Sequence, residues 1–270
     1  MRIAMLGGDG RMPYAAATLR GWGHEVRLSA CEGVSLSPRD LAEAEAVVLP
    51  HPLSRDGVHL CAPTSPLAVP LATLLSMLPE GVPLVCGHAD GAIAGRAGVL
   101  EYGSDARFLE RSSTLTAEGG ISLLLGRRPS ALCDTPCLIL GSGRLAGALS
   151  DLLSGLHVPV TVMARRSLGP LAGGHIPLPL AELPARIADF PILINTIPAP
   201  ILTPPILTNA ARGSILLELS AVPRVVDTDL LLALGIEYIA APALPGRYAP
   251  KSAGEAVAEV VARLLSQLTR

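Results

Sequence analysis

The sequence predicts an α/β protein with two domains, each built on an open parallel sheet, and a cleft between the domains. Short aliphatic segments alternate with helical segments along the 270 residues, which is the pattern of βαβ units. Hydrophobic residues make up 50% of the chain and aromatic residues only 3%, so Leu, Val, Ile and Ala must fill the core. Such aliphatic cores are typical of parallel sheets covered on both faces. The alternation starts twice, each time with a strand that runs into glycine.

The first half of the chain predicts one sheet with its helices. The expected strands are 2–6, 25–29, 45–50 and 82–86, and the expected helices between them are 11–21 and 66–77. A weaker strand over 97–102 precedes a short helix near 104–110. We therefore expect an N-terminal domain, residues 1–115, of flavodoxin-like or Rossmann-like type that holds the substrate.

The second half repeats the pattern. The expected elements are a helix over 116–126, a strand over 137–140, a helix over 144–156 and strands over 158–164, 190–195, 214–219 and 236–240. Stretches rich in Pro and Gly at 168–180 and 198–205 are predicted to be loops. Residues 116–250 are therefore expected to form a second Rossmann-like domain. The last segment, 251–268, carries apolar residues at helical spacing, so residues 251–270 are predicted to form a helix that docks across the domains.

Composition narrows the possible partners. The formal net charge is −2 and no basic patch stands out, so we expect no nucleic-acid partner. No apolar segment reaches the roughly 18 residues that a membrane span needs, and the first residues are typical of a strand instead of a signal peptide. We therefore expect a cytoplasmic protein with reduced cysteines. Cys133 and Cys137 are close in sequence, but no second Cys or His pair lies nearby, so no metal site is predicted.

The strongest chemical signal is a glycine motif between the strand at 137–140 and the helix at 144–156. It reads Gly141, Ser142, Gly143, Arg144, Leu145 and Ala146, and fits G-x-G-x-x-G/A. Gly141 permits the tight turn, Gly143 lets a diphosphate approach the backbone, and Ala146 lets the helix pack closely on the strand. The free N–H groups of the helix start attract the diphosphate, and Arg144 adds a positive charge.

The end of the next strand indicates which dinucleotide binds. NAD enzymes usually place a carboxylate there, whereas this strand ends in Ala164, Arg165, Arg166 and Ser167. Guanidinium groups pair well with a phosphate, so NADP is predicted, with NAD as the other possibility. Asn195 and Thr196, past a later strand, either contact the nicotinamide ribose or form a turn before Pro198.

A second glycine turn follows the first strand and includes Gly7, Gly8, Asp9 and Arg11. It does not fit the dinucleotide motif, and the carboxylate of Asp9 would repel a phosphate. We interpret it as a turn that lines the cleft between the domains and not as a second nucleotide site.

Several short motifs together resemble one family. They are Gly7-Gly8-Asp9-x-Arg11, Ser54-Arg55-Asp56-Gly57, Thr116-Ala117-Glu118-Gly119, Gly141-x-Gly143-Arg144, Ala164-Arg165, Ile194-Asn195-Thr196-Ile197-Pro198 and the stretch from Leu244 to Gly254. The chain resembles the A subunits of dipicolinate synthases over nearly its whole length. The stretch from Leu244 to Gly254 is the most specific, and we find no generic structural reason for it. The chain departs from the family pattern at Val222, Arg224 and Val225 around Pro223, and at His51-Pro52.

The resemblance implies an activity and a setting. It implies an oxidoreductase that converts dihydro- or hydroxytetrahydrodipicolinate to aromatic dipicolinate, with hydride transfer to NADP. It also implies a flavoprotein-like second subunit, hence a homo- or hetero-oligomer, and the cytoplasm of the mother cell of a sporulating bacterium.

A small dicarboxylate substrate needs cationic partners. Candidates are Arg11, Arg55 with its neighbour Ser54 in a turn after a strand, and Lys251 at the start of the last helix. A proton acceptor is also useful for the oxidation. The candidates are His51, His88, Asp56 and Glu118, and none is assigned firmly. Glu118 has a second interpretation, because Thr116 is a natural N-cap for a helix over 116–126.

Two other functions are considered. A two-domain 2-hydroxyacid or amino-acid dehydrogenase expects a late catalytic His, but the only histidines after residue 150 are His157 and His175. A non-catalytic protein that binds NADP while a partner does the chemistry is the other alternative. Turnover by this chain alone would exclude that passive role.

Overall fold

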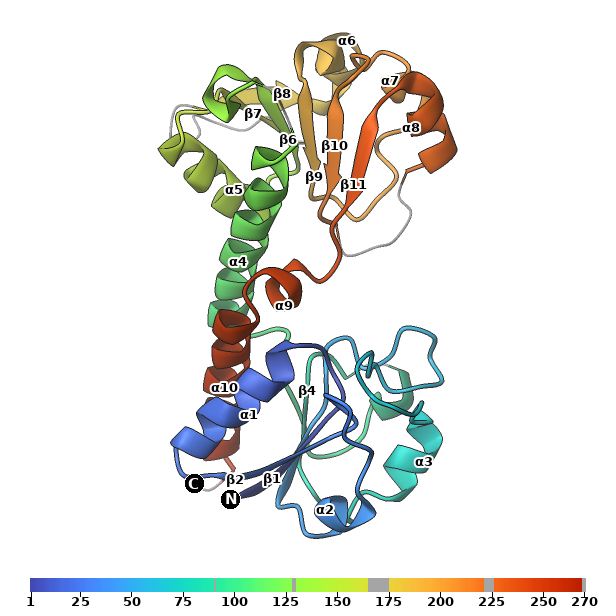
Figure 1. The fold of residues 1–270 in the computed structure, drawn as a ribbon, viewed down its shortest axis with the longest axis vertical. Coiled ribbons are helices and arrows are strands. Elements are labelled where there is room, and N and C mark those ends of the chain that lie inside the picture. Colours follow the sequence, from blue (N-terminus) through green and yellow to red (C-terminus); the bar gives the residue numbers. More distant parts are fainter. Residues whose placement is uncertain (90, 128–129, 165–174, 221–225, 269–270) are drawn as a thin grey trace. The chain divides into compact units, whose positions relative to one another are not determined.

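A computed structural model gives the fold, and it describes residues 1–89, 91–127, 130–164, 175–220 and 226–268. The chain forms two compact units (Figure 1). The first unit comprises Met1–Ser112 together with Pro245–Arg270, and the second comprises Ser113–Leu244. The sequence suggested limits a few residues further along, at 115/116 and 250/251.

The first unit is built on a five-stranded sheet in the order β2-β1-β3-β4-β5, with every pair parallel. The strands are β1 (Arg2–Leu6), β2 (Glu25–Ser29), β3 (Ala46–Val48), β4 (Leu84–Cys86) and β5 (Val99–Glu101). This is the flavodoxin-like order, and it reverses between β1 and β3. Aliphatic side chains bury both faces of the central strands, which is why these strands read as unbroken apolar runs.

Helices cover both faces of this sheet. They are α1 (Arg11–Gly21), α2 (Pro38–Ala42), α3 (Leu71–Ser76) and α10 (Pro250–Ser266), and the short helix α9 (Leu244–Tyr248) precedes α10. The last helix, α10, packs against α1 and contributes Val257 and Val261 to the core on that side. On the other face, Leu41 of α2 and Leu74 of α3 complete a second cluster. Figure 1 shows α1 and α10 lying alongside each other in this unit.

The helix α4 (Ala106–Leu125) is longer than expected. The sequence predicted two helices, 104–110 and 116–126, with a break between them, and this prediction was wrong. Thr116, the expected N-cap of the second helix, lies inside α4 and is therefore not an N-cap. The chain caps α4 earlier, where the Asp105 carboxylate accepts the N–H of Phe108 at 3.0 Å. Phe108 then joins the core of the first unit and Ile121 that of the second.

The second unit contains a six-stranded parallel sheet in the order β11-β10-β9-β6-β7-β8. The strands are β6 (Cys137–Leu140), β7 (Val160–Ala164), β8 (Ile176–Pro179), β9 (Ile192–Asn195), β10 (Ile215–Glu218) and β11 (Glu237–Ala240). In chain order this is the dinucleotide-binding arrangement 3-2-1-4-5-6, with its switch point between β6 and β9. The predicted fold class of two Rossmann-like parallel sheets is confirmed.

The helices of the second unit are α5 (Arg144–Gly155), α6 (Leu183–Arg186), α7 (Pro204–Leu207) and α8 (Thr228–Leu234). The predicted loops at 168–180 and 198–205 are wrong in part, because β8 and the start of α7 fall within them. Both elements contain proline where it is tolerated. β8 is an edge strand, and α7 begins with Pro204, whose missing N–H costs nothing in the first helical turn.

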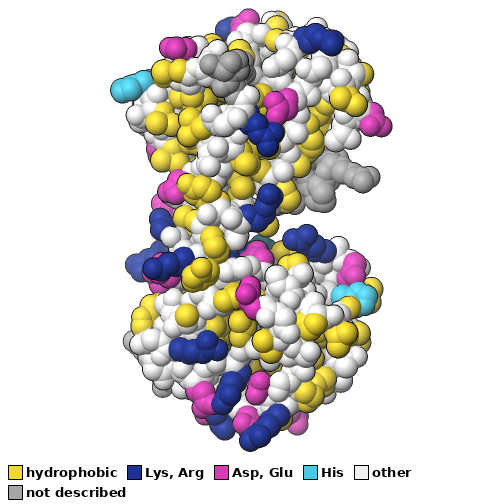
Figure 2. Space-filling model, viewed as in Figure 1, with side chains coloured by type: hydrophobic (Ala, Val, Ile, Leu, Met, Phe, Trp, Pro, Cys, Tyr) yellow, Lys and Arg dark blue, Asp and Glu magenta, His cyan; other side chains and the backbone are white. Residues whose placement is uncertain are grey.

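No helix among the described ranges has the length and low charge that a membrane crossing requires. On the face drawn in Figure 2, Lys and Arg side chains lie in separate groups among acidic and hydrophobic ones.

Candidate functional site

The turn after β6 is shaped by Gly141. Its φ of +114° lies in the region that favours glycine, and its N–H donates to the carbonyl of Met163 at 2.9 Å. A Cβ at this position would lie 2.5 Å from Oγ1 of Thr196, which itself donates to the carbonyl of Leu140 at 2.8 Å. Gly141 is therefore required by the packing of the turn against the end of β9.

Gly143 has a different environment. It is the N-cap of α5 with φ −84°, a value open to any residue, and no heavy atom lies within 4 Å of a Cβ built there. Its lack of a side chain also means that no cap oxygen accepts the N–H groups at the start of the helix. No described neighbour requires glycine here, and the backbone at the start of α5 is exposed. Ala146 is buried and lets α5 pack closely on the sheet, as predicted.

Asn195 and Glu218 form a buried pair at the ends of β9 and β10. The Asn195 amide donates to both carboxylate oxygens of Glu218, at 3.1 and 2.9 Å, and its own oxygen accepts the N–H of Ile197 at 3.1 Å. The Glu218 carboxylate also accepts the N–H of Ser220 at 2.9 Å. The polar groups of Asn195 are thus used within the chain, and the pair fixes the turn beside Thr196.

The sequence reasoning missed Glu218. The available signal was a carboxylate at the end of an aliphatic run, Ile215–Glu218, which burial in a sheet disfavours unless the group has partners. The prediction about the ribose phosphate concerns Arg165, Arg166 and Ser167, which lie outside the described residues. Ala164, the last residue of β7, is buried.

In the first unit, the glycine turn after β1 is closed by an ion pair. The Arg11 guanidinium donates to both oxygens of Asp9, at 2.7 and 3.0 Å, and to the carbonyl of His51 at 3.0 Å. Burial acts to lower the pKa of Arg11, but the hydrogen bond and charge of Asp9 raise it above the ordinary value. Arg11 therefore joins the loops after β1 and β3 at the switch point of this sheet.

His51 and His88 come together at the carboxyl edge of the first sheet. Their ring centroids are 5.1 Å apart with the rings nearly perpendicular, and His88 Nδ1 lies 3.4 Å from a carboxylate oxygen of Glu101. Gly87 permits this arrangement, because a Cβ there would collide with the His51 ring. Nearby, Tyr102 is fully buried, which raises its pKa, and its hydroxyl donates to the carbonyl of Leu49 at 3.2 Å.

The Ser54–Gly57 motif forms a self-contained turn. The Ser54 hydroxyl donates to Asp56 and accepts the N–H of Gly57, at 3.0 and 2.9 Å. The backbone N–H and ring of His59, followed by the N–H of Val58, lower the pKa of Asp56 well below its usual range. Asp56 is therefore a poor proton acceptor near neutral pH. Arg55 is exposed and forms no ion pair with another described residue.

Glu118 lies inside α4, in the part that belongs to the second unit, so its interpretation as part of a helix cap was wrong. Lys251 is an exposed residue in the first turn of α10. These two residues and the histidine pair are thus carried by different elements, and Glu118 lies in a different unit from the other three.

The stretch from Leu244 to Gly254 has a structural explanation after all. A Cβ at Gly246 would lie 2.6 Å from a carboxylate oxygen of Asp9, and one at Gly254 would collide with the backbone of α1 at Arg11. Both glycines therefore let the end of the chain pack closely on the Asp9–Arg11 turn. The first and last motifs of the sequence are one contact region of the first unit.

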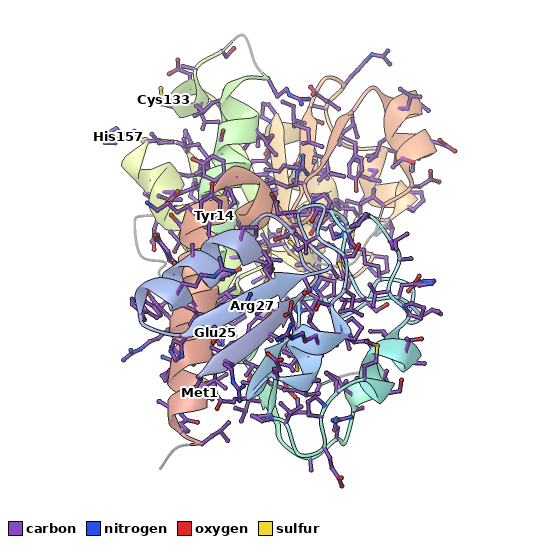
Figure 3. All side chains as sticks on the ribbon, turned by 60° about the horizontal axis from the view of Figure 1, so that its bottom comes forward. Met1, Tyr14, Glu25, Arg27, Cys133 and His157 are labelled. Carbon is purple, nitrogen blue, oxygen red and sulfur yellow. The ribbon has the colours of Figure 1, made fainter. Side chains whose placement is uncertain are left out.

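Within the described ranges, no group of three or more His, Cys, Asp or Glu side chains is arranged to hold a metal ion. Cys133 is exposed (Figure 3), whereas Cys137 is buried in β6. Burial raises the pKa of Cys137 to about 12, so its thiol stays protonated at neutral pH and is a poor ligand.

The two sheets define a class of protein, a two-domain α/β protein with the fold of dehydrogenases. A solved D-lactate dehydrogenase from Sporolactobacillus sp. matches with a TM-score of 0.65 and 15% identity, over 99% of this chain and 96% of that chain. At this identity the likeness concerns the fold alone.

Dipicolinate synthase structures are more similar. A crystal structure of dipicolinate synthase from Bacillus subtilis matches with a TM-score of 0.84 and 25% identity, over 99% of this chain and 96% of that chain. The A subunit of the synthase from Bacillus halodurans matches with a TM-score of 0.85 and 22% identity, over 97% of both chains.

The sequence comparisons point to the same family. Residues 2–98 match the family described as the N-terminal domain of the dipicolinate synthase A subunit. The curated A subunit of dipicolinate synthase from Bacillus subtilis (strain 168) is 32% identical over 160 residues, which is 58% of this chain and 54% of that protein. The match thus spans about half the length of the curated relative. The predicted resemblance is confirmed: residues 2–98 match the model of this family, and the chain is similar to dipicolinate synthase A subunits in sequence and in fold.

Proposed function

We propose that this chain is an NAD(P)-dependent oxidoreductase of the dipicolinate synthase type. The proposed reaction oxidises dihydro- or 4-hydroxytetrahydrodipicolinate to dipicolinate, with NADP as the preferred hydride acceptor. One observation carries the proposal. At the switch point of the second sheet, α5 begins at Gly143, whose missing Cβ faces open space and whose backbone start has no side-chain cap. A dinucleotide diphosphate is the ligand that such a helix start fits.

The proposed coenzyme is held by residues on both sides of the switch point. The helix start from Ser142 to Leu145 takes the diphosphate, with Arg144 as an exposed positive charge. Arg165, Arg166 and Ser167 follow β7 on the adenosine side and take the additional phosphate. Asn195 and Thr196 follow β9 on the nicotinamide side, where Asn195 and Glu218 keep the turn in place. When bound, NADP supplies the acceptor for a hydride.

We propose that the histidine pair of the first unit accepts the proton that the substrate loses during oxidation. Loss of water from the 4-hydroxy substrate gives the dihydro ring. Oxidation then removes a hydride from one ring carbon and a proton from a neighbouring ring atom, which leaves the ring aromatic. His88 is exposed and lies beside Glu101, so its ring accepts that proton and the carboxylate stabilises the imidazolium. Arg55 and Lys251 are the cations proposed for the two substrate carboxylates, while Arg11 positions His51.

The similarity to dipicolinate synthase A subunits also supports a proposal about the partner protein and the cellular location of this chain. The curated relative is by name one of the subunits of dipicolinate synthase, which supports a second, flavoprotein-like subunit for this chain. We propose that the two form a hetero-oligomer in the cytoplasm of a sporulating mother cell.

Calorimetry tests the coenzyme assignment. NADP should bind at least about tenfold more tightly than NAD, because a guanidinium–phosphate pair contributes roughly 1.5–3 kcal/mol. Arg165→Ala should remove that preference and leave NAD affinity unchanged. Tighter binding of NAD would overturn the choice of NADP, and no heat with either coenzyme would overturn the whole proposal.

Turnover tests the catalytic role. The purified chain is mixed with NADP and enzymatically generated hydroxytetrahydrodipicolinate, with and without the second subunit, and NADPH and dipicolinate are followed by absorbance. Turnover by this chain alone excludes the passive binding role. His88→Gln should then slow turnover at neutral pH more than at high pH, while NADP affinity stays unchanged.

The structure argues against a 2-hydroxyacid dehydrogenase mechanism. His157 directly follows α5, and His175 precedes β8 and lies 3.1 Å from the Ser154 hydroxyl at the end of α5. Both therefore lie at the amino edge of the sheet, opposite to the edge where the coenzyme binds.

A further inference from the structure

A surface cavity of about 360 Å³ opens on the first unit where the end of α1, the start of α4 and the last turns of α10 meet. It shares no residue with the sites described above. Phe108, Ala256 and Val260 are buried and form its apolar floor. Trp22, at the end of α1, forms a wall with 51% of its surface exposed. A volume of this size is within the range of pockets that hold small organic ligands.

Of the three arginines around the cavity, one has a carboxylate partner among the described residues and two have none. Arg263 is held by Asp105 at 2.6 Å, and that carboxylate also caps α4, so both groups are committed. Arg107 and Arg111 stand one turn apart on the same face of α4 and are exposed. Neither forms an ion pair with another described residue. Like charges at this spacing repel each other, and an anion bound between them would relieve that repulsion.

Trp22 adds a second kind of recognition. It is the only tryptophan in the sequence, and its ring is half exposed beside the arginines and not packed in the core. An exposed indole offers a flat apolar face on which another ring stacks. Charged side chains and an indole around the same cavity suit a ligand that carries both a charge and a ring.

We propose that this cavity binds a small planar organic anion, an aromatic carboxylate, with its carboxylate between Arg107 and Arg111 and its ring against Trp22. Glu259, the remaining charge in the lining, opposes a second negative group on the same ligand. Arg263 is kept from moving into the cavity by Asp105. The proposal does not depend on the coenzyme or on the reaction proposed above.

The single tryptophan makes the test direct. The full-length protein is titrated with sodium benzoate, and Trp22 emission is excited at wavelengths that benzoate does not absorb. We expect saturable quenching with a Kd in the low-millimolar range, as typical ligand efficiencies give for so small a molecule. The double variant Arg107→Ala, Arg111→Ala should weaken binding at least tenfold, and Glu259→Gln should tighten it.

The controls separate this site from general charge effects. Arg39→Ala removes an exposed arginine that is paired with Glu43 on α2, and it should leave the titration unchanged. Circular dichroism confirms that each variant is folded. Non-saturable quenching, equal quenching in the double variant, or inorganic phosphate binding as tightly as benzoate would each overturn the proposal.

Discussion

Each unit of the molecule has a glycine turn after its first strand, at the switch point of its sheet, yet the two turns differ in what packs against them. In the first unit the turn is closed by the chain itself. Arg11 holds Asp9 with two hydrogen bonds, and Gly246 packs against the same carboxylate. In the second unit the turn stays open, because no described atom lies near the Cβ position of Gly143 and no cap covers the start of α5.

The difference teaches how a glycine motif is to be interpreted. Glycines such as Gly7, with φ +62° and a Cβ position 2.9 Å from the carbonyl of Cys61, are required by the backbone and its neighbours. A glycine with an ordinary φ and empty surroundings, such as Gly143, is not required by packing, and Gly147 and Gly155 in the same helix share this property. Gly143 differs from these two in its place at the start of α5, at the switch point of the sheet, where we propose that a diphosphate binds. Topology places both turns where ligands bind in α/β sheets, and only the local packing distinguishes them.

The largest expected effect comes from closing the open turn. Gly143→Asp would add a cap oxygen for the N–H groups of α5, because the φ and ψ of this residue suit an N-cap. Coenzyme affinity should fall by about 100-fold or more, because the new carboxylate occupies the proposed diphosphate site and its negative charge repels the diphosphate. Stability should rise by a few tenths of a kcal/mol, the usual gain of a polar cap over glycine.

Calorimetry and urea denaturation measure the two effects separately. Gly155→Asp serves as the matched control, because it adds the same charge at the other end of α5, where no heavy atom lies within 4 Å of a Cβ. An affinity for NADP that survives Gly143→Asp would show that the open start of α5 does not bind the coenzyme.

Part of this contrast was visible in the sequence. The motif at 141–146 and the limits of β1, β2 and α1 follow from local patterns that the structure reproduces. The continuity of α4 was not visible, because a threonine such as Thr116 before an apolar segment is typical of an N-cap, whereas here the helix continues through it. The contacts of Gly246 and Gly254 with the Asp9–Arg11 turn were also hidden, since they join residues far apart in the chain. The burial of Glu218 likewise depends on a neighbour strand.

Opening the closed turn is the next largest change. Arg11→Ala would leave the Asp9 carboxylate partly buried without its partner, since the two side chains are 15% and 25% exposed. We expect a loss of about 3 kcal/mol in the free energy of unfolding, measured with urea. Coenzyme affinity should not change, because Arg11 belongs to the other unit.

Asp9→Asn provides the control, since it keeps one of the two hydrogen-bond acceptors for Arg11 and should cost less. If both variants lose the same free energy of unfolding, the charge of Asp9 stabilises the turn and its hydrogen bonds to Arg11 do not.

Within the open turn, the two glycines should respond differently. Gly141→Ala forces a Cβ against Thr196 at a φ of +114°, and should cost about 2 kcal/mol of stability. Gly143→Ala meets no neighbour, so it should cost less, about 1 kcal/mol at most, because alanine is a poorer N-cap than glycine. Thermal unfolding of both variants checks this, and a large loss in Gly143→Ala would remove the distinction between a structural and a ligand-facing glycine.

The smallest expected effect concerns the helix start that the chain caps itself. The N–H of Phe108, followed by the hydrogen bond and then the charge of Arg263, lowers the pKa of Asp105 in the folded state against the opposing effect of burial. A lowered pKa means that the ionised carboxylate stabilises the fold above its unfolded pKa of about 3.9, and that this stabilisation is lost as the pH falls through the folded value. Asp105→Asn keeps a cap oxygen but not the charge, so it should cost about 1 kcal/mol at pH near 7 and almost nothing at pH near 2. Urea denaturation of both proteins at the two pH values measures this difference. If Asp105→Asn costs the same free energy of unfolding at both pH values, the hydrogen bond alone stabilises the start of α4. The negative charge of Asp105 would then contribute nothing there, and the start of α4 would not differ electrostatically from the uncapped start of α5.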